Sequence, residues 1–298
     1  MKERNLEGLQ AIHSTLYLNI LFYLFQSIFS RVARVCKNDA GGPHKFKNKW
    51  TTFLKARLNC SVPGDIPFYF NEIQSTVSNF GPNSAELNKD GLIYTVFTTP
   101  ENSIAGSAIC AFRLSDLTKA FEDGPFKHQD AVNSNWLPVS KSQVPNPRPG
   151  ICHSTDRIYK NQTLTTEEQR LNFIRRHPLM DWSVPGSTQS PIFVKTSLGE
   201  RLTVIAVDVD VSAINGRTYD VLFLGTTNGR VLKVVNVEEE QASEQNANLR
   251  DGYRSQFRDA RSQWSQNGRR KNTHPVLIES LQVLPYNCLL YTSDAADE

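Results

Sequence analysis

Short apolar runs and alternating apolar and polar positions dominate the pattern of this chain, and they predict strands much more often than helices. The expected strands are 30–36, 68–73, 92–98, 107–112, 203–211, 219–225, 230–235 and 276–284. Asn215-Gly216 and Asn228-Gly229 separate the three strands between 203 and 235, and both residue types tolerate the positive φ that tight hairpins need. Such a three-strand meander is most of a propeller blade, so the chain is expected to be all-β.

Four segments depart from this strand pattern. Apolar residues near helical spacing predict a short helix within 45–58, and residues 115–121 predict a helix that Ser115 can cap. Residues 124–191 form a proline-rich excursion with a further helix at 164–177, and an excursion of this length is typical of an insertion packed against a scaffold. Residues 238–273 are polar and charged, which predicts a mobile, solvated loop.

The apolar run Leu16–Phe29 has 14 residues, fewer than the ~20 that span a bilayer and within the ~7–15 of a signal-peptide core. No net positive charge precedes it and no small-residue cleavage site follows it. We therefore favour a foreign, artefactual segment over a working signal peptide for residues 1–29.

The five cysteines include no Cys-x-x-Cys pair, which removes the usual zinc-ribbon and redox spacings. Asn59-Cys60-Ser61 and Asn161-Gln162-Thr163 are N-glycosylation sequons, and the first overlaps a cysteine. Together they indicate an oxidising, extracellular compartment. The formal net charge of +3 is too small to imply a nucleic-acid partner.

Enzyme signatures are missing from the sequence. The six histidines are scattered, and no G-x-S-x-G, G-x-G-x-x-G or P-loop motif occurs. Asp208 and Asp210 are interpreted as exposed carboxylates on one strand, and Cys152, next to His153, is interpreted as a disulfide cysteine rather than a nucleophile. We predict no catalytic residue, metal, cofactor or small-molecule substrate.

A series of segments in order resembles the sema domain of semaphorins. They are RVARVCKND (31–39), WTTFLKARLNCSVPG (50–64), FYFNEIQS (68–75), VFTTPENSIAGSAICAF (96–112), GPFK (124–127), NSNWLPV (133–139), VPNPRPGIC (144–152), FIRRHPLMD (173–181) and YDVLFLGTTNGRVLKVV (219–235). PGDIPFYFNEIQST and FTTPENSI look most like invertebrate class-1 transmembrane semaphorins. The resemblance implies a partial seven-bladed β-propeller over 30–285, in which the excursion 124–191 is the helical extrusion.

The resemblance also implies two disulfides, Cys36–Cys152 and Cys60–Cys110, and leaves Cys288 without a partner. A whole sema domain is much longer, so about four of the seven blades are expected. Residues 1–29 match nothing in the family. Residues 286–298 abandon the strand pattern and resemble translated adaptor sequence, so this tail is expected to be artefactual.

The function implied is that of an extracellular ligand in axon guidance and cell migration, which binds a plexin receptor of class A and works as a homodimer. Its parent is expected to be a single-pass plasma-membrane protein. Arg175, then Arg176 and His177, match the family's receptor-facing position before H-P-L-M-D, although both arginines also fit the solvated side of a helix. Trp50 and Trp136 are expected in the core. The alternatives are a receptor-side, plexin-like propeller or a non-functional truncated product.

Overall fold

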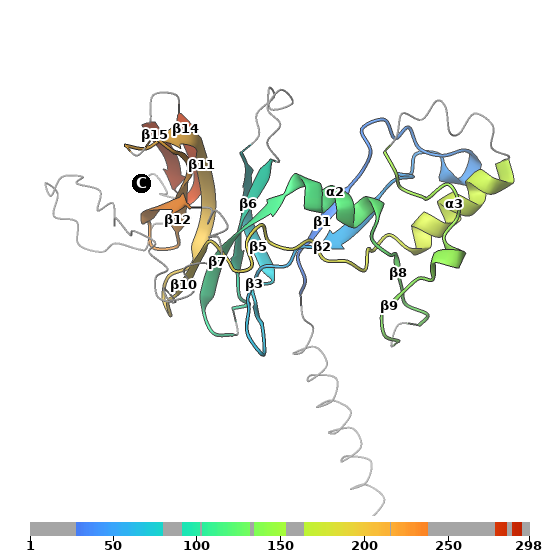
Figure 1. Cartoon of the computed structure of the whole chain (residues 1–298), viewed down its shortest axis with the longest axis horizontal. Coiled ribbons are helices and arrows are strands. Elements are labelled where there is room, and N and C mark those ends of the chain that lie inside the picture. The colour runs from blue at the N-terminus through green and yellow to red at the C-terminus, as the bar shows by residue number, and fades with distance from the viewer. Residues whose placement is uncertain are drawn as a thin grey trace, which may run out of the picture.

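The computed structural model describes residues 28–79, 91–152 and 164–237, apart from 102, 132, 133 and 215, together with 278–284 and 288–293. Within this part of the chain, strands form several small antiparallel sheets, and two α-helices lie at one end of the molecule, beside some of the smaller sheets (Figure 1). The expected all-β class is therefore confirmed. The N-terminal apolar run up to residue 27, the whole polar loop 238–273 and the sequon residue Asn161 lie outside the described residues.

A four-stranded antiparallel sheet forms the centre of the described fold, in the order β10-β7-β6-β5. Its strands are β5 (Glu72–Ser78), β6 (Leu92–Thr98), β7 (Gly106–Arg113) and β10 (Phe193–Thr196). Almost every residue of β6 and β7 is buried, which explains their unbroken apolar runs and confirms the strands expected at 92–98 and 107–112.

The expected meander is present as a second sheet in the order β11-β12-β13. Its strands are β11 (Leu202–Ser212), β12 (Thr218–Thr226) and β13 (Val231–Asn236). Each hairpin closes by a hydrogen bond from a glycine N–H, Gly216 to Ala213 O at 2.9 Å and Gly229 to Thr226 O at 3.1 Å. Both glycines have φ of 70–76°, while Asn228 does not have positive φ. The turns are thus three-residue loops with one left-handed glycine rather than two-residue Asn-Gly turns.

The two sheets face each other across a buried apolar cluster. Its members are Leu92, Tyr94, Val96, Ile109, Ala111, Phe193, Leu202, Ile205, Leu222, Leu224, Leu232 and Val234. Tyr94 is fully buried, and its hydroxyl donates to Asp220 Oδ2 at 2.6 Å and accepts from Asn236 Nδ2 at 3.0 Å. The polar end of this side chain is therefore satisfied between the sheets.

The other face of the central sheet packs on the excursion, which the chain makes between β7 and β10. It contains α2 (Leu114–Glu122), β8 (Lys127–His128), β9 (Leu137–Pro138), η3 (Lys141–Gln143) and α3 (Leu164–Arg176). The expected start of the insertion at 124 falls just after α2. The predicted Ser115 cap is wrong, because the helix begins one residue earlier and its N-cap, Arg113, makes no side-chain capping bond.

A small sheet, β1 (Arg31–Arg34) with β2 (Leu54–Arg57), packs beside α2, and β3 (Ser61–Val62) pairs with β4 (Phe68–Tyr69). The helix expected within 45–58 is wrong, since the segment holds only η1 (His44–Phe46) and then β2. Leu54, Ala56 and Leu58 are buried while the residues between them are half-buried, which is the period of a strand.

The C-terminal strands β14 (Ile278–Leu284) and β15 (Cys288–Ser293) form an antiparallel hairpin near β11 (Figure 1). The expectation that the strand pattern stops after residue 285 is therefore wrong, because Leu289 to Thr292 pair in register with β14. In the described residues, no helix combines the length and apolar character needed to cross a membrane.

Candidate protein-binding surface

The C-terminal end of α3 is fixed by the segment that follows it. Inside the excursion, Leu171 and Ile174 of α3 are buried. The chain then runs parallel to β2: Lys55 N–H donates to Pro178 O at 2.7 Å, and Met180 N–H donates to Lys55 O at 2.8 Å. The sequence H-P-L-M-D therefore forms an additional strand-like edge on β2, and this edge holds the last turn of α3 in place.

Four aromatic rings in successive contact pack at this last turn of α3. Phe126 meets Phe173 edge to face at 5.0 Å between centroids, and Phe173 stacks on His177 at 4.3 Å. His177 in turn lies 4.7 Å from His128 of β8. Such contacts favour one fixed arrangement of the side chains, so the position just after α3 is well defined.

The surroundings of His177 disfavour its charged form. Burial lowers its pKa, the hydrogen bond to Phe173 O raises it, and His128 and Arg176 lower it further, so that the pKa lies below the usual value. Nδ1 is 2.9 Å from Phe173 O, so the neutral ring donates from Nδ1. His177 is thus held by its hydrogen bond and by ring contacts with Phe173 and His128.

Arg175 and Arg176 are exposed in the last turn of α3. In the part of the chain that the structure describes, neither side chain makes a hydrogen bond or an ion pair. Positive charge at a helix C-terminus is favourable to the helix, which by itself accounts for part of their placement. Both guanidinium groups are also free to meet carboxylates of another molecule.

Two exposed apolar residues belong to the segment that pairs with the strand of His128. Leu137 of β9 pairs directly with His128 of β8, and the side chains of Trp136 and Leu137 are 45% and 60% exposed. The expected core position of Trp136 is therefore wrong, and so is that of Trp50, which is 64% exposed. We call the set Arg175, Arg176, His177, His128, Trp136 and Leu137 the α3-end surface.

Sequence reasoning missed the second half of this surface. His128 and Trp136 stand 49 and 41 positions before His177, and no spacing rule links them to it. The adjacent exposed pair Trp136-Leu137 in a polar stretch is the only sequence feature that points to an interaction role.

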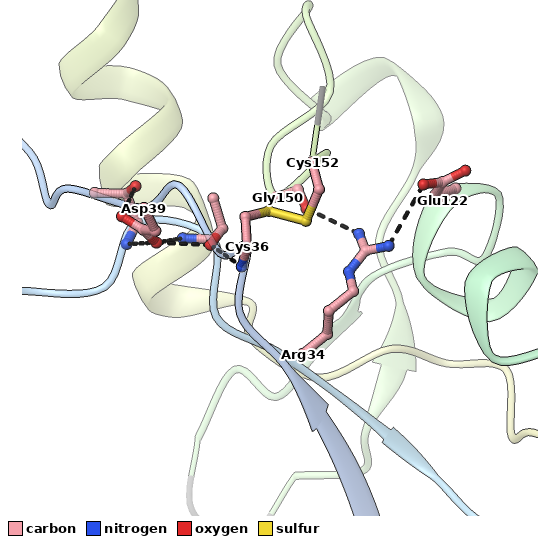
Figure 2. Close-up of a disulfide and its surroundings, with 8 residues drawn as sticks. Arg34, Cys36, Asp39, Glu122, Gly150 and Cys152 are labelled. Carbon is pink, nitrogen blue, oxygen red and sulfur yellow. Dashed lines mark hydrogen bonds and ion pairs between the residues drawn. A yellow bond between two sulfur atoms is a disulfide. The ribbon is translucent and has the colours of Figure 1, made fainter. Parts of the chain in front are cut away.

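One disulfide ties the excursion to the segment after β1, and a second ties the segment after β2 to strand β7 of the central sheet. Cys36 is bonded to Cys152 and Cys60 to Cys110, the pairs that the family resemblance implied. Figure 2 shows Arg34 beside the first bond, where its guanidinium donates to Gly150 O at 2.9 Å and lies 3.5 Å from Glu122 of α2. Strand β1 is thereby connected to both sides of the excursion.

A carboxylate organises the turn after β1, also visible in Figure 2. Asp39 accepts hydrogen bonds from the backbone N–H groups of Gly41, Thr51 and Thr52 and from both threonine hydroxyls, at 2.6–3.0 Å. Burial raises the pKa of Asp39, but these hydrogen bonds outweigh the effect of burial and hold the pKa below its usual value.

Among the described residues, no group of three or more His, Cys, Asp or Glu side chains could hold a metal ion.

Comparison with known proteins identifies the fold. A family model described as the Sema domain matches residues 73–252, which is more than half of the chain. The chain belongs to the semaphorin family. Semaphorin-1A of Drosophila melanogaster is 52% identical over 219 residues, covering 74% of this chain and 23% of the relative. Semaphorin-1A of Schistocerca americana is 49% identical over 232 residues, covering 74% and 30%. The likeness is therefore to the class-1 semaphorins of invertebrates.

Solved semaphorin structures share the fold. The extracellular domains 1-2 of Drosophila Semaphorin 1a match with a TM-score of 0.69 and 44% identity, over 90% of this chain and 48% of that one. A structure of Drosophila Plexin A in complex with Semaphorin 1b matches with a TM-score of 0.60 and 48% identity, over 70% of this chain and 39% of that one. The semaphorin sheets described above are thus part of a sema-domain β-propeller, and the chain spans about a quarter of the curated relatives' length.

Proposed function

We propose that this chain is part of an extracellular semaphorin ligand that binds a plexin receptor through its sema propeller. The solved relative in complex with Drosophila Plexin A, 48% identical, supports the choice of partner. In this role the chain is a binding protein and not an enzyme, and it needs no cofactor, nucleic acid or small-molecule substrate. The signalling it serves is axon guidance and cell migration.

The proposal extends to the whole ligand. The receptor is a plexin of class A, the parent works as a homodimer, and a single membrane span anchors it at the cell surface. Asn59 and Asn161 carry N-glycans, in keeping with two disulfides and two sequons in one chain.

The α3-end surface is the proposed receptor contact, and the exposed, unpaired arginines are the observation that carries it. The backbone bonds after α3 and the ring stack fix the helix end that carries Arg175 and Arg176, so binding has to order their side chains but not the backbone. Trp136 adds the aromatic area that is common among interface residues with large energetic effects. His177 contributes by holding the last turn of α3.

A charge reversal tests this surface. Binding of the chain and its variants to an immobilised class A plexin ectodomain is measured by surface plasmon resonance. Arg175→Glu is expected to raise Kd about 30-fold or more, the value for a hot spot of ~2 kcal/mol, with a smaller rise for Arg176→Glu. Trp136→Ala is expected to raise Kd without changing its salt dependence.

Lys119→Glu is the matched control, because Lys119 is also an exposed basic residue in the last turn of a helix, α2. It should change Kd less than about threefold if only general electrostatic attraction is altered. Equal weakening by Arg175→Glu and Lys119→Glu, or no binding by the unaltered chain, would contradict the proposal.

A further inference from the structure

The sequon residue Asn59 lines a pocket of about 220 Å³. Its other lining residues are Ser61, Cys110, Pro185, Gly186, Ser187, Thr188, Gln189 and Ser190. The Cys60–Cys110 disulfide therefore lies at one wall, and the loop 185–190, which joins the excursion to β10, makes up the other.

The loop is anchored directly to the sequon and to the central sheet. Asn59 N–H donates to Val184 O at 2.9 Å, and Ser187 N–H donates to Ala111 O at 2.7 Å. Between these bonds the backbone passes so close that a Cβ on Gly186 would lie 3.9 Å from Asn59 O. A group attached to the side chain of Asn59 would therefore lie next to the loop 185–190.

The pocket has a polar lining, and one of its buried polar atoms has no partner among the described residues. Ser61, Ser187, Thr188, Gln189 and Ser190 contribute hydroxyl and amide groups to it. Asn59 Oδ1 is buried and has no hydrogen-bond partner among the described residues. Buried polar atoms are nearly always paired, so an unpaired side-chain oxygen at a polar pocket indicates a missing partner.

Size restricts what that partner can be. Pockets that enclose drug-sized ligands usually have about 300–1,000 Å³. At about 220 Å³, this pocket suits one hydroxylated ring and not an extended ligand. A sugar offers hydroxyl and acetamide groups to the polar lining and an apolar ring face to Pro185.

We propose that the first N-acetylglucosamine of a glycan on Asn59 occupies this pocket and holds the loop 185–190 against the sheet. The inference rests on the glycosylation of Asn59 proposed above. In that reaction Nδ2 forms a bond to C1 of a diphosphate-linked oligosaccharide, the diphosphate carrier leaves, and Nδ2 loses one proton to a base. This first sugar would then pack against the protein and stabilise the loop 185–190, instead of extending into solvent.

The test compares forms of the whole chain that differ in the sugar at residue 59. The chain is secreted from cells that make high-mannose glycans, and endoglycosidase H trims each glycan to one N-acetylglucosamine. Ser61→Ala removes the sequon but keeps Asn59, and Ser61→Thr keeps the sequon as the matched control. Hydrogen exchange of the peptide that covers 184–190 is followed by mass spectrometry.

The trimmed chain and Ser61→Thr should exchange like the fully glycosylated chain, and Ser61→Ala about tenfold faster in this peptide. If Ser61→Ala is not secreted, complete deglycosylation of the folded chain by peptide N-glycosidase supplies a sugar-free form in which residue 59 has become Asp, and an Asn59→Asp variant is its control. Equal exchange in the one-sugar and sugar-free forms would overturn the inference while leaving glycosylation intact. An unmodified Asn59 in the secreted chain would overturn both, which keeps the two failures distinct.

Discussion

Removal of the outer disulfide is the perturbation whose size follows most directly from the structure. In Cys36→Ala/Cys152→Ala the outer link is lost and the inner Cys60–Cys110 bond remains. The two bonds are nested, with sequence separations of 116 and 50 residues. Because the inner bond bypasses its 50 residues, the loop that the outer bond closes in the unfolded chain has only about 66 residues.

The chain-entropy relation converts that loop into a free energy. For a closed loop of about 66 residues it gives ~4.4 kcal/mol at 25 °C, compared with ~4.9 kcal/mol if the inner bond were ignored. We therefore expect the double variant to lose about 4 kcal/mol of unfolding free energy. Native domains have only ~5–15 kcal/mol, so the loss brings the fold close to its limit.

Urea titration followed by tryptophan fluorescence measures this change. The midpoint should fall, and the m-value should rise because the unfolded chain expands when the link is gone. Cys288→Ala is the control, since Cys288 belongs to neither disulfide and both bonds remain. A loss below about 1 kcal/mol with an unchanged m-value would refute the reasoning, because the bond would then not restrict the unfolded chain.

Three further perturbations have defined outcomes. Asp39→Asn should weaken the dependence of stability on acid pH. Because the pKa of Asp39 is lowered in the folded chain, its contribution to the free energy of unfolding is complete above its usual pKa and is lost as pH falls through the folded value. Acid titration followed by circular dichroism measures this change. The folded pKa of His177 is also lowered, so stability should fall as pH drops below about 6.5, and His177→Gln should flatten that fall in melts at pH 5–8. Gly150 has φ of +82° and an added Cβ would lie 2.7 Å from Leu54 Cδ1, so Gly150→Ala should cost ~1 kcal/mol or more in urea unfolding.

The sequence predicted strands best where both faces are buried. The limits of β6 match the predicted range 92–98, and those of β7 extend it by one residue at each end, because an unbroken apolar run ends where burial ends. The helix expected within 45–58 failed for a related reason. Trp50 contributes to the helical spacing there, yet it is 64% exposed, while Leu54 and Ala56 alternate with half-buried Lys55 and Arg57.

The candidate site was predicted only in part. Arg175 and Arg176 were found from a motif, and the structure places both on an exposed helix end. His128 and Trp136 were not found, since they reach the surface through the β8–β9 pair and a ring stack. Contacts of this kind depend on the path of the excursion, which local periodicity does not determine.

The nesting of the two disulfides also bears on how the chain emerges during synthesis. Cys36 is synthesised first, and its partner Cys152 follows 116 residues later. Cys60 is separated from its partner Cys110 by only 50 residues. At about 5–20 residues per second, Cys36 stays unpartnered for roughly 6–23 s, with Cys60 the first thiol to appear beside it. A transient Cys36–Cys60 link is therefore the natural early error. Its correction by thiol–disulfide exchange, a step of seconds to hours, would set the pace at which the native chain leaves an oxidising compartment.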